Sequence, residues 1–436
     1  MRILLISANR EPFPESVFPV GLMYVAHGLQ MAGAQVLTFD MRHQTAISSL
    51  QKVLLEFRPD HIGISLRNID NASYPAVRFY LPSYQALMQA VRTLCEAPII
   101  LGGSAFSLFP EEITKHLGAD GGVQGEGEKA AGLFQNHSGG QIVSMGLLNI
   151  DEVAFPKNIK EIFPGFHRYE TIGLQSARGC PNHCIYCTYP SLEGRQHRAR
   201  SPESVVGEIT MFYKDFGIRE FFIVDSLFNA DEDHMLRVLE MLAQLSLPIR
   251  FSCYLQPKVS DLGIFSLLRE AGCIAIDFGT DSGSPAMLSR LRKPFTGDDI
   301  EKVSRACREA RIDFCHSLIF GGPGETHKTI SETVSLMDEI SPKAVIAMTG
   351  VRIYPGTEMS RIAVAEGVCE AGQSLLEPKF YFPQMGADEL LKTVYQAVEG
   401  KKNWFFPGKR DWSSTLGFKV LKFLYRKGPV WRSFRK

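Results

Sequence analysis

Short apolar runs alternate with amphipathic stretches over the first 135 residues, and this alternation predicts a parallel sheet with crossover helices. The expected strands are the apolar runs at 2–7, 35–39, 61–66, 98–101 and 121–123. Helices are expected between them, at 20–31, 48–57, 83–95 and 110–117. This order predicts an α/β domain of the doubly wound, Rossmann-like type, in which ligands bind at the carboxyl ends of the strands.

A second series of apolar runs follows a stretch, 137–168, that is rich in Gly, Pro and Asn and has no clear period. We expect that stretch to be a linker lying over the surface. The strands expected after it are the runs at 171–176, 220–224, 250–254, 274–278, 313–320 and 344–349. Six β/α units in about 180 residues predict a partial (β/α)6 TIM-like barrel, with chemistry on the loops after its strands.

The chain therefore divides into four expected segments: a Rossmann-like domain (1–136), the linker (137–168), the partial barrel (169–358) and a small, mainly helical C-terminal segment (359–436). Within the last segment, residues 415–426 predict a basic amphipathic helix, because Lys419, Lys422 and Arg426 share one face. Such a helix suits peripheral contact with an anionic membrane. It also suits docking onto the acidic remainder of the chain, and we favour docking.

Composition and charge exclude several classes of protein. The 436 residues are 45% hydrophobic and 22% charged, which excludes disorder, collagen-like repeats and small disulfide scaffolds. Residues 401–436 contain 11 Lys or Arg and one acid, so the preceding 400 residues carry a net charge of −10. Because no basic stripe or RNA-binding module occurs elsewhere, we expect no nucleic-acid partner. An odd number of cysteines, and the lack of a signal peptide or an apolar span of about 20 residues, predict a cytoplasmic location.

Three cysteines, Cys180, Cys184 and Cys187, are the strongest chemical signal, and they directly follow the first expected strand of the barrel. A disulfide framework is disfavoured because three is odd. A structural zinc site would need a fourth ligand, for which His183 and His197 are near in sequence. An iron–sulfur cluster held by three thiolates would instead leave one iron open for a substrate. The strand context favours the cluster over zinc.

The CxxxCxxC spacing of these cysteines resembles the signature of radical S-adenosylmethionine (SAM) enzymes. The resemblance implies a [4Fe-4S] cluster on the three cysteines, whose open iron binds SAM and cleaves it to a 5′-deoxyadenosyl radical. Later loops resemble those that contact SAM in this family, although the usual Glu of one motif is Asp281 here. The residues that the resemblance places at SAM are Tyr186, Asp225, Asn229, Asp281, Ser282 and Gly322. Each loop alone is a weak signal, because Gly-Pro-Gly is usually a turn and an Asp after a strand is usually a helix cap.

Small and polar residues also end the strands of the first domain. Gly102, Gly103 and Ser104 follow its fourth strand, and Gly125 and Glu126 follow its fifth. Glycine at these places lets the backbone approach a bulky ligand. A dinucleotide is disfavoured because no glycine-rich turn follows the first strand. Glu126 has a simpler interpretation as well, since an acidic residue in the first turn of a helix interacts favourably with the helix dipole.

Together with the stretch from Pro19 to Leu22, this layout resembles the cobalamin-binding domain that precedes the barrel in one large subclass of radical SAM enzymes. The DxHxxG motif, which supplies a histidine to cobalt in many cobalamin proteins, is absent from the sequence. The loop that starts at Ser65 is then expected to cover the lower face of cobalt, with Arg67 as the candidate residue. Arginine cannot ligate a metal. The alternative is that Arg67 pairs with Asp70 and only stiffens the loop.

These resemblances imply a cobalamin-dependent radical SAM enzyme with three cofactors: a [4Fe-4S] cluster, SAM and cobalamin. We expect a C-methyltransferase that acts on an unactivated carbon of a small molecule, either a lipid or a natural-product intermediate, through the 5′-deoxyadenosyl radical and methylcobalamin. An external electron donor of the flavodoxin or ferredoxin type is also implied. Oxidative cyclisation or ring rearrangement without methyl transfer is the alternative within the enzyme class. A non-catalytic cobalamin or redox sensor is the alternative outside it.

Overall fold

The computed structural model describes residues 1–11, 17–44, 47–136, 140–169, 171–407 and 428–433. The chain divides into two compact units. The first unit contains residues 1–71, 78–173 and 191–194, and the second contains 72–77, 174–190 and the described residues from 195 onward. The segment 72–77 therefore belongs to the second unit, although the chain on both sides of it belongs to the first.

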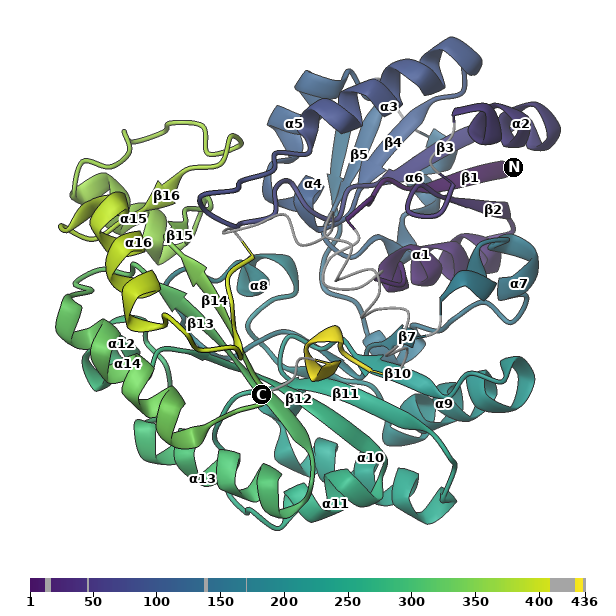
Figure 1. Ribbon diagram of the computed structural model, residues 1–436. Helices are drawn as coiled ribbons and strands as arrows, with labels where there is room; N and C mark the ends of the chain where they lie inside the picture. Colours follow the sequence, from purple (N-terminus) through teal and green to yellow (C-terminus); the bar gives the residue numbers. More distant parts are fainter. Residues whose placement is uncertain (12–16, 45–46, 137–139, 170, 408–427, 434–436) are drawn as a thin grey trace. The chain divides into compact units, whose positions relative to one another are not determined.

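The first unit is built around a six-stranded parallel sheet in the order β2-β1-β3-β4-β5-β6. Its strands are β1 (Arg2–Ser7), β2 (Gln35–Asp40), β3 (His61–Ser65), β4 (Ile99–Gly102), β5 (Gly121–Gln124) and β6 (Gln141–Ser144). Helices cover both faces of the sheet (Figure 1): α1 (Val20–Met31), α2 (Ile47–Phe57), α3 (Leu81–Leu94), α4 (Ser104–Leu108), α5 (Pro110–Leu117) and α6 (Ala131–Asn136). The parallel register brings the last residues of three neighbouring strands, Ser7, Ser65 and Gly102, to the same end of the sheet.

The segment 137–168 is not the surface linker that its composition predicts. It contributes β6 at the edge next to β5, and its helix α7 (Ile159–Ile162) packs against β2 at the opposite edge. The Thr38 hydroxyl donates a hydrogen bond to the Ile162 carbonyl oxygen at 2.8 Å, and the Tyr169 hydroxyl donates to the Asp40 carboxylate at 2.8 Å. Its apolar residues enter the core without a recognisable period, because they lie in turns and in helices too short to repeat.

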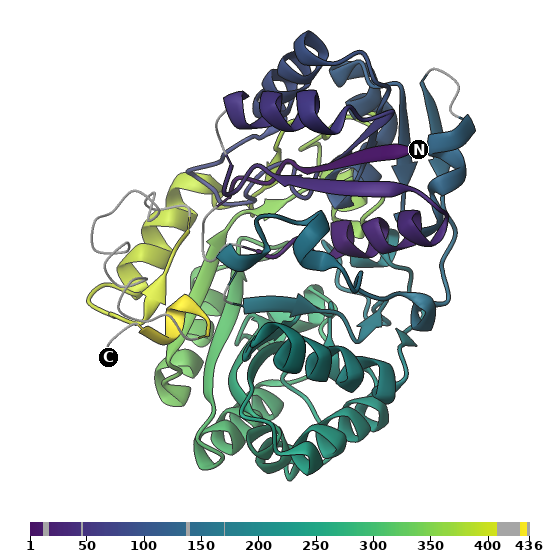
Figure 2. The same ribbon diagram turned by 90° about the vertical axis from the view of Figure 1, so that its right-hand side faces the viewer.

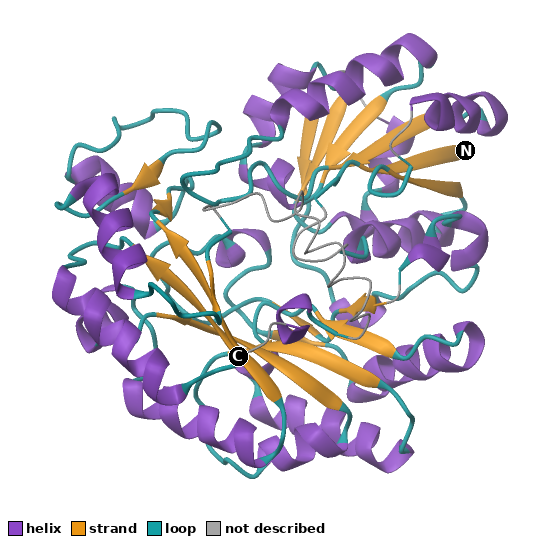
Figure 3. Cartoon of the chain, viewed as in Figure 1, coloured by secondary structure: helices purple, strands orange, loops and turns teal. Residues whose placement is uncertain are grey.

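The second unit is an open sheet backed by helices. Seven strands follow the order β17-β14-β13-β12-β11-β10-β7: β7 (Thr171–Leu174), β10 (Glu220–Ile223), β11 (Arg250–Leu255), β12 (Cys273–Asp281), β13 (Asp313–Phe320), β14 (Ala344–Thr349) and β17 (Trp404–Phe405). The helices along one face of the sheet are α9 (Pro202–Phe216), α10 (Glu232–Leu245), α11 (Ile264–Glu270), α13 (Gly297–Glu309) and α14 (His327–Ile340), as Figures 1 and 3 show. Figure 2 shows the same sheet from the side. This is the predicted partial TIM-like barrel, with β17 as an additional strand.

Shorter elements complete the second unit. Two antiparallel pairs join β8 (Ala177–Arg178) to β9 (Arg198–Ala199) and β15 (Val351–Arg352) to β16 (Phe380–Tyr381). The remaining helices are α8 (Tyr189–Leu192), α12 (Pro285–Arg290), α15 (Glu358–Ala365) and α16 (Gly386–Ala397). The basic helix expected at 415–426 lies outside the described residues. No helix in the described part of the chain is long and apolar enough to cross a membrane.

Candidate active site

The three cysteines lie in the loop that follows β8, in the second unit. Backbone hydrogen bonds tie this loop to two distant segments. The Ile185 N–H donates to the Leu291 carbonyl oxygen at 3.4 Å, and the Ile185 carbonyl oxygen accepts from the Met359 N–H at 2.8 Å. Within the loop, the Cys187 N–H donates to the Cys184 carbonyl oxygen at 3.3 Å. The loop is therefore held by the fold around it as well as by its own turn.

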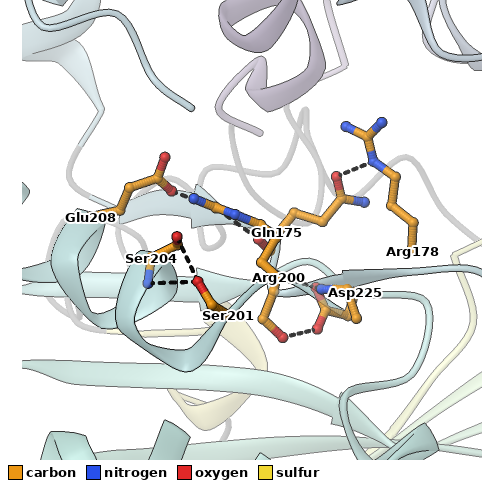
Figure 4. Close-up of polar contacts among 9 residues, drawn as sticks. Gln175, Arg178, Arg200, Ser201, Ser204, Glu208 and Asp225 are labelled. Atoms are coloured by element: carbon orange, nitrogen blue, oxygen red, sulfur yellow. Dashed lines mark hydrogen bonds and ion pairs between the residues drawn. The ribbon is translucent and has the colours of Figure 1, made fainter. Parts of the chain in front are cut away.

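Asp225, which the resemblance places at SAM, holds the start of the cysteine loop. Its carboxylate accepts hydrogen bonds from the backbone N–H of Ser176 at 2.7 Å and of Ala177 at 3.1 Å, and it also accepts one from the Ser176 hydroxyl. The residue is only 1% exposed, and its side chain is drawn in Figure 4. This geometry gives Asp225 a positioning role, because it fixes the strand end from which the cysteine loop departs.

A second buried network surrounds the same strand end (Figure 4). Arg200 donates through Nη1 to Glu208 Oε2 at 2.7 Å and to the Gln175 carbonyl oxygen at 3.1 Å. Arg178 donates through Nε to Gln175 Oε1 at 2.8 Å. Burying charged groups is costly unless they are paired. The Arg200–Glu208 pair meets this condition, and its geometry holds the β8–β9 pair next to the cysteines.

A buried lysine beside the cysteines, Lys293, is not among the candidate residues that the sequence singled out. Its ammonium lies 2.8 Å from the Asp281 carboxylate, and both side chains are almost fully buried. The Tyr186 hydroxyl donates a hydrogen bond to the same carboxylate. Burial lowers the pKa of Lys293, but Asp281 and Cys184 outweigh burial, so the pKa is raised and the amine stays charged. Burial, and then Asp281, raises the pKa of Tyr186, so its hydroxyl stays protonated.

Asp281 reaches this cluster through an irregularity at the end of β12. The pairing of β12 with β13 shifts its register between Gly279 and Asp281, and Asp281 has a positive φ of 64°. Bulges of this kind re-aim a side chain, and Asp tolerates the left-handed conformation better than most residues. Strained backbone of this type is often found at functional sites.

The surroundings of the three thiols fit an iron–sulfur cluster. Burial raises the pKa of Cys184 and raises the pKa of Cys187 to about 12, and Cys180 contributes in the same direction to both. Lys293 acts in the opposite direction on the pKa of both thiols, although burial outweighs it. A neighbouring cation stabilises the thiolate form, which is the form that binds metal.

The two histidines of the alternative zinc site have other partners. His183 Nδ1 lies 2.9 Å from Arg195 Nη1, and His197 Nδ1 lies 4.0 Å from the Asp231 carboxylate. Among the described residues, no group of three or more His, Cys, Asp or Glu side chains is gathered closely enough to hold a single metal ion. In an iron–sulfur cluster each thiolate binds its own iron atom, so the thiolates need not meet at one point.

Three further residues that the resemblance places at SAM make contacts within the fold. The side-chain amide of Asn229 donates to the Gln256 carbonyl oxygen at 3.1 Å and accepts from the Gln256 N–H at 3.0 Å. The Ser282 hydroxyl lies 2.9 Å from the Thr333 hydroxyl on α14. Gly322 is buried against α12. The structure therefore brings Tyr186 and Asp281 to the cysteines, whereas the side chains of Asn229 and Ser282 form hydrogen bonds with Gln256 and Thr333.

In the first unit, Gly103 is a position at the carboxyl end of the sheet where only glycine fits. Its φ is +95°, and an added Cβ would lie 2.6 Å from the Leu66 carbonyl oxygen. Gly102, in contrast, would accept a Cβ at ordinary contact distance. The Ser104 hydroxyl donates to the Arg67 carbonyl oxygen at 2.6 Å. The loops after β3 and β4 are therefore packed backbone to backbone, and this approach requires glycine at 103.

Arg67 projects from the loop after β3. Its side chain is exposed. Ser65, the last residue of β3, is partly exposed at the same end of the sheet. Arg67 and Ser65 therefore both lie where the loop after β3 begins, at the carboxyl end of the first unit's sheet.

The loop after β5 is tied to the segment after β6. Gly125 has a φ of +88°, and an added Cβ would lie 2.9 Å from the Met145 carbonyl oxygen. The buried Glu126 carboxylate accepts a hydrogen bond from the Leu148 N–H at 2.7 Å. Glu126 therefore holds two loops of the first unit together.

Two family models match these two parts of the chain. The B12 binding domain matches residues 7–134, and the radical SAM superfamily matches residues 174–337, which include the cysteine loop and Lys293. The chain therefore contains a radical SAM domain and a B12-binding domain. The predicted fold class, the enzyme class and the three cofactors, a [4Fe-4S] cluster, SAM and cobalamin, are thereby confirmed.

The curated relatives of this chain include methyltransferases. It is 25% identical to tryptophan 2-C-methyltransferase of Streptomyces laurentii over 81% of this chain and 73% of the relative. It is 23% identical to cytidylyl-2-hydroxyethylphosphonate methyltransferase of Streptomyces wedmorensis over 86% of this chain and 84% of the relative. These relatives agree with the main prediction, a cobalamin-dependent radical SAM methyltransferase.

Among solved structures, the radical SAM methyltransferase TsrM of Kitasatospora setae, with tryptophan and a SAM analogue bound, matches with a TM-score of 0.87. The match covers 99% of this chain and 98% of TsrM at 20% sequence identity. At this identity the likeness establishes the fold.

Proposed function

We propose that this protein is a C-methyltransferase that uses cobalamin and SAM to methylate a small organic acceptor. The observation that carries the proposal is the buried Lys293–Asp281 pair beside three cysteine thiols, in a chain that also has a B12-binding domain. The relatives that methylate tryptophan or a nucleotide-linked phosphonate support methyl transfer over the alternatives of cyclisation and sensing.

The charged pair suits the amino-acid end of SAM. That end carries an ammonium and a carboxylate, and the pair offers one group of each opposite charge. Lys293 would bind the carboxylate, and Asp281 would bind the ammonium while accepting the Tyr186 hydroxyl. Charge-assisted hydrogen bonds in a buried place are strong and directional. We therefore assign Lys293 and Asp281 to SAM, and we assign Asp225 and Asn229 to support of the loops around it.

The remaining assignments concern the metal cofactors. When bound, the cluster supplies the electron that cleaves SAM, and cobalamin supplies a metal centre that carries the methyl group. Cys180, Cys184 and Cys187 would hold the cluster. Cobalamin would bind at the carboxyl ends of the first unit's strands, where Gly103 would keep the loop after β4 close to the loop after β3 and Arg67 would face the cofactor without ligating cobalt. The electron would come from an external donor of the flavodoxin or ferredoxin type.

An anaerobic assay of the cluster-reconstituted protein with SAM, cobalamin and a reductant tests the proposal. We expect S-adenosylhomocysteine, the product of methyl donation by SAM, and 5′-deoxyadenosine, the product of reductive cleavage, both measured by mass spectrometry. The Cys184→Ala variant should form no 5′-deoxyadenosine, whereas Cys95→Ala, a partly buried cysteine in the first unit, should behave as the wild type. Formation of 5′-deoxyadenosine without S-adenosylhomocysteine would refute methyl transfer.

A further inference from the structure

The turn after β12 decides where the Asp281 carboxylate points. The Ser282 N–H donates a hydrogen bond to the Thr280 carbonyl oxygen at 2.8 Å, across a single residue, Asp281, whose φ is +64°. A three-residue turn with a positive central φ is the rare and strained kind. Such a backbone persists only where the surrounding structure holds it. A contact from outside β12 must therefore keep this turn in place.

The Thr333 hydroxyl, in the middle of α14, makes that contact. Its oxygen accepts a hydrogen bond from the Gly283 N–H at 3.1 Å and lies 2.9 Å from the Ser282 hydroxyl. Its hydrogen is donated to the Thr329 carbonyl oxygen, one helical turn earlier, at 3.0 Å. A hydroxyl has one hydrogen to donate, so Thr333 can only accept from Ser282 and Gly283. One oxygen atom of α14 therefore binds both residues that follow Asp281.

The contact between α14 and the turn is buried. Thr333 and Ser284 are 0% exposed, and Ser282 is 2% exposed. An added Cβ at Gly283 would lie 2.9 Å from the Leu336 side chain and 3.1 Å from the Thr333 Cα, so the helix packs directly on the backbone. A buried N–H that loses its acceptor is costly. Removal of the Thr333 hydroxyl would leave the Gly283 N–H in that state.

The place of the Asp281 carboxylate matters because its two partners come from other segments of the chain. Lys293 lies in the turn after α12, with its ammonium 2.8 Å from the carboxylate. Tyr186, which donates to the same carboxylate, lies in the cysteine loop. Gly283 is only two residues beyond Asp281, so movement of one moves the other. The carboxylate therefore meets both partners in the position that α14 sets.

We propose that Thr333 is a positioning residue for SAM binding, because its hydroxyl keeps the Asp281 carboxylate where it can receive the ammonium of SAM. Thr333 acts through Asp281 and not by contact with SAM. This inference rests on the proposed function, which assigns Asp281 to SAM. When only a fraction of the protein can bind, the apparent dissociation constant rises in inverse proportion to that fraction. Loss of the hydroxyl should therefore weaken SAM binding and leave the rate at saturating SAM unchanged.

Isothermal titration calorimetry of SAM with the cluster-reconstituted, full-length protein tests the inference. Thr333→Val keeps the shape of the side chain and removes the hydroxyl, so it should bind SAM about tenfold more weakly. Thr333→Ser keeps the hydroxyl and should bind SAM within about twofold of the wild type. Thr114→Val is the matched control, since the buried Thr114 hydroxyl also donates one turn back in its helix, to the Pro110 carbonyl oxygen at 2.7 Å, but lies in the first unit.

Two further measurements separate positioning from a merely structural role. In the formation of S-adenosylhomocysteine, Thr333→Val should raise the KM for SAM about tenfold and keep kcat within about twofold of the wild type. Asp281→Asn should weaken SAM binding in the wild type, and much less in the Thr333→Val background, because residues that act through one another have non-additive effects. Thr333→Ala removes the same hydroxyl and replaces Thr333→Val if the valine variant does not fold.

Each outcome supports or overturns the inference. A Thr333→Val variant that unfolds at lower urea concentration but binds SAM with wild-type affinity would make Thr333 structural only and overturn it. Equal losses of affinity in Thr333→Val and Thr333→Ser, or additive losses in the double variant, would overturn it as well. If Asp281→Asn does not weaken SAM binding, the assignment of Asp281 fails and the inference fails with it. If Asp281→Asn weakens SAM binding and Thr333→Val does not, only the role of Thr333 is wrong.

Discussion

Replacement of Asp225 by alanine should destabilise the second unit, because this carboxylate is the acceptor for two buried backbone donors. The variant would leave the N–H groups of Ser176 and Ala177 unsatisfied. Each unsatisfied buried donor costs about 2 kcal/mol, so the expected loss in the free energy of unfolding is about 4 kcal/mol. Asp225→Asn keeps one carbonyl oxygen for both donors and loses only the charge, so its expected loss is about 1 kcal/mol.

Urea unfolding of the protein without cofactors measures these losses. Tryptophan fluorescence is a suitable signal, because Trp404 and Trp431 both lie in the second unit. The slope of the free energy against urea should be similar in all proteins, so that the midpoints report stability. If Asp225→Ala unfolds at the wild-type midpoint but fails to bind SAM, Asp225 is a ligand and the positioning role is wrong.

Three further predictions follow from single residues. Lys293→Met should weaken SAM binding at least tenfold, as measured by calorimetry on the reconstituted protein, and should leave the iron content near that of the wild type. Lys293→Arg should recover most of the affinity for SAM, because it keeps the positive charge. Equal losses of affinity in both variants would contradict the assignment of Lys293 to SAM. Gly103→Ala should destabilise the first unit by about 2 kcal/mol and reduce cobalamin retention on gel filtration, whereas Gly132→Ala, which meets no neighbour, should not. Burial lowers the pKa of His316 to about 3, whereas its pKa in the unfolded chain is about 6.5. The contribution of His316 to the free energy of unfolding should therefore be constant above about pH 6.5 and should fall progressively as the pH drops toward 3. The loss by pH 5 is about 2 kcal/mol in urea unfolding, and a His316→Asn variant with the same pH dependence would show that another group is responsible.

The cysteine motif was predictable because its chemistry lies within eight consecutive residues. Residues that are close along the chain must be close in space, so the spacing of Cys180, Cys184 and Cys187 needs no tertiary information. The order of strands and helices was predictable for a similar reason, since fully buried parallel strands appear as uninterrupted apolar runs. Both depend on local sequence.

Lys293 was not predictable in this way. It lies in a turn after α12, and only the fold brings it to Asp281 and Cys184. Its one local signal is a lysine between the buried Leu291 and Phe295, which is unusual for a surface turn. Asp225 shows the opposite difficulty, because an acid after a strand has the same appearance in the sequence whether its carboxylate faces a ligand or the backbone.

The segment that follows residue 140 has a consequence for domain transplantation. Because it supplies the strand beside β5 and then reaches the far edge of the sheet through Ile162 and Tyr169, a fragment ending at residue 136 would present both flanks of its sheet unprotected. Unprotected flanks promote intermolecular strand pairing. A portable corrinoid module cut from this protein must therefore extend to about residue 169, just before β7 of the second sheet and well past the end of the B12-binding match at 134. Chimeras joined at the shorter boundary are expected to aggregate, whereas those joined at the longer one are expected to remain dispersed.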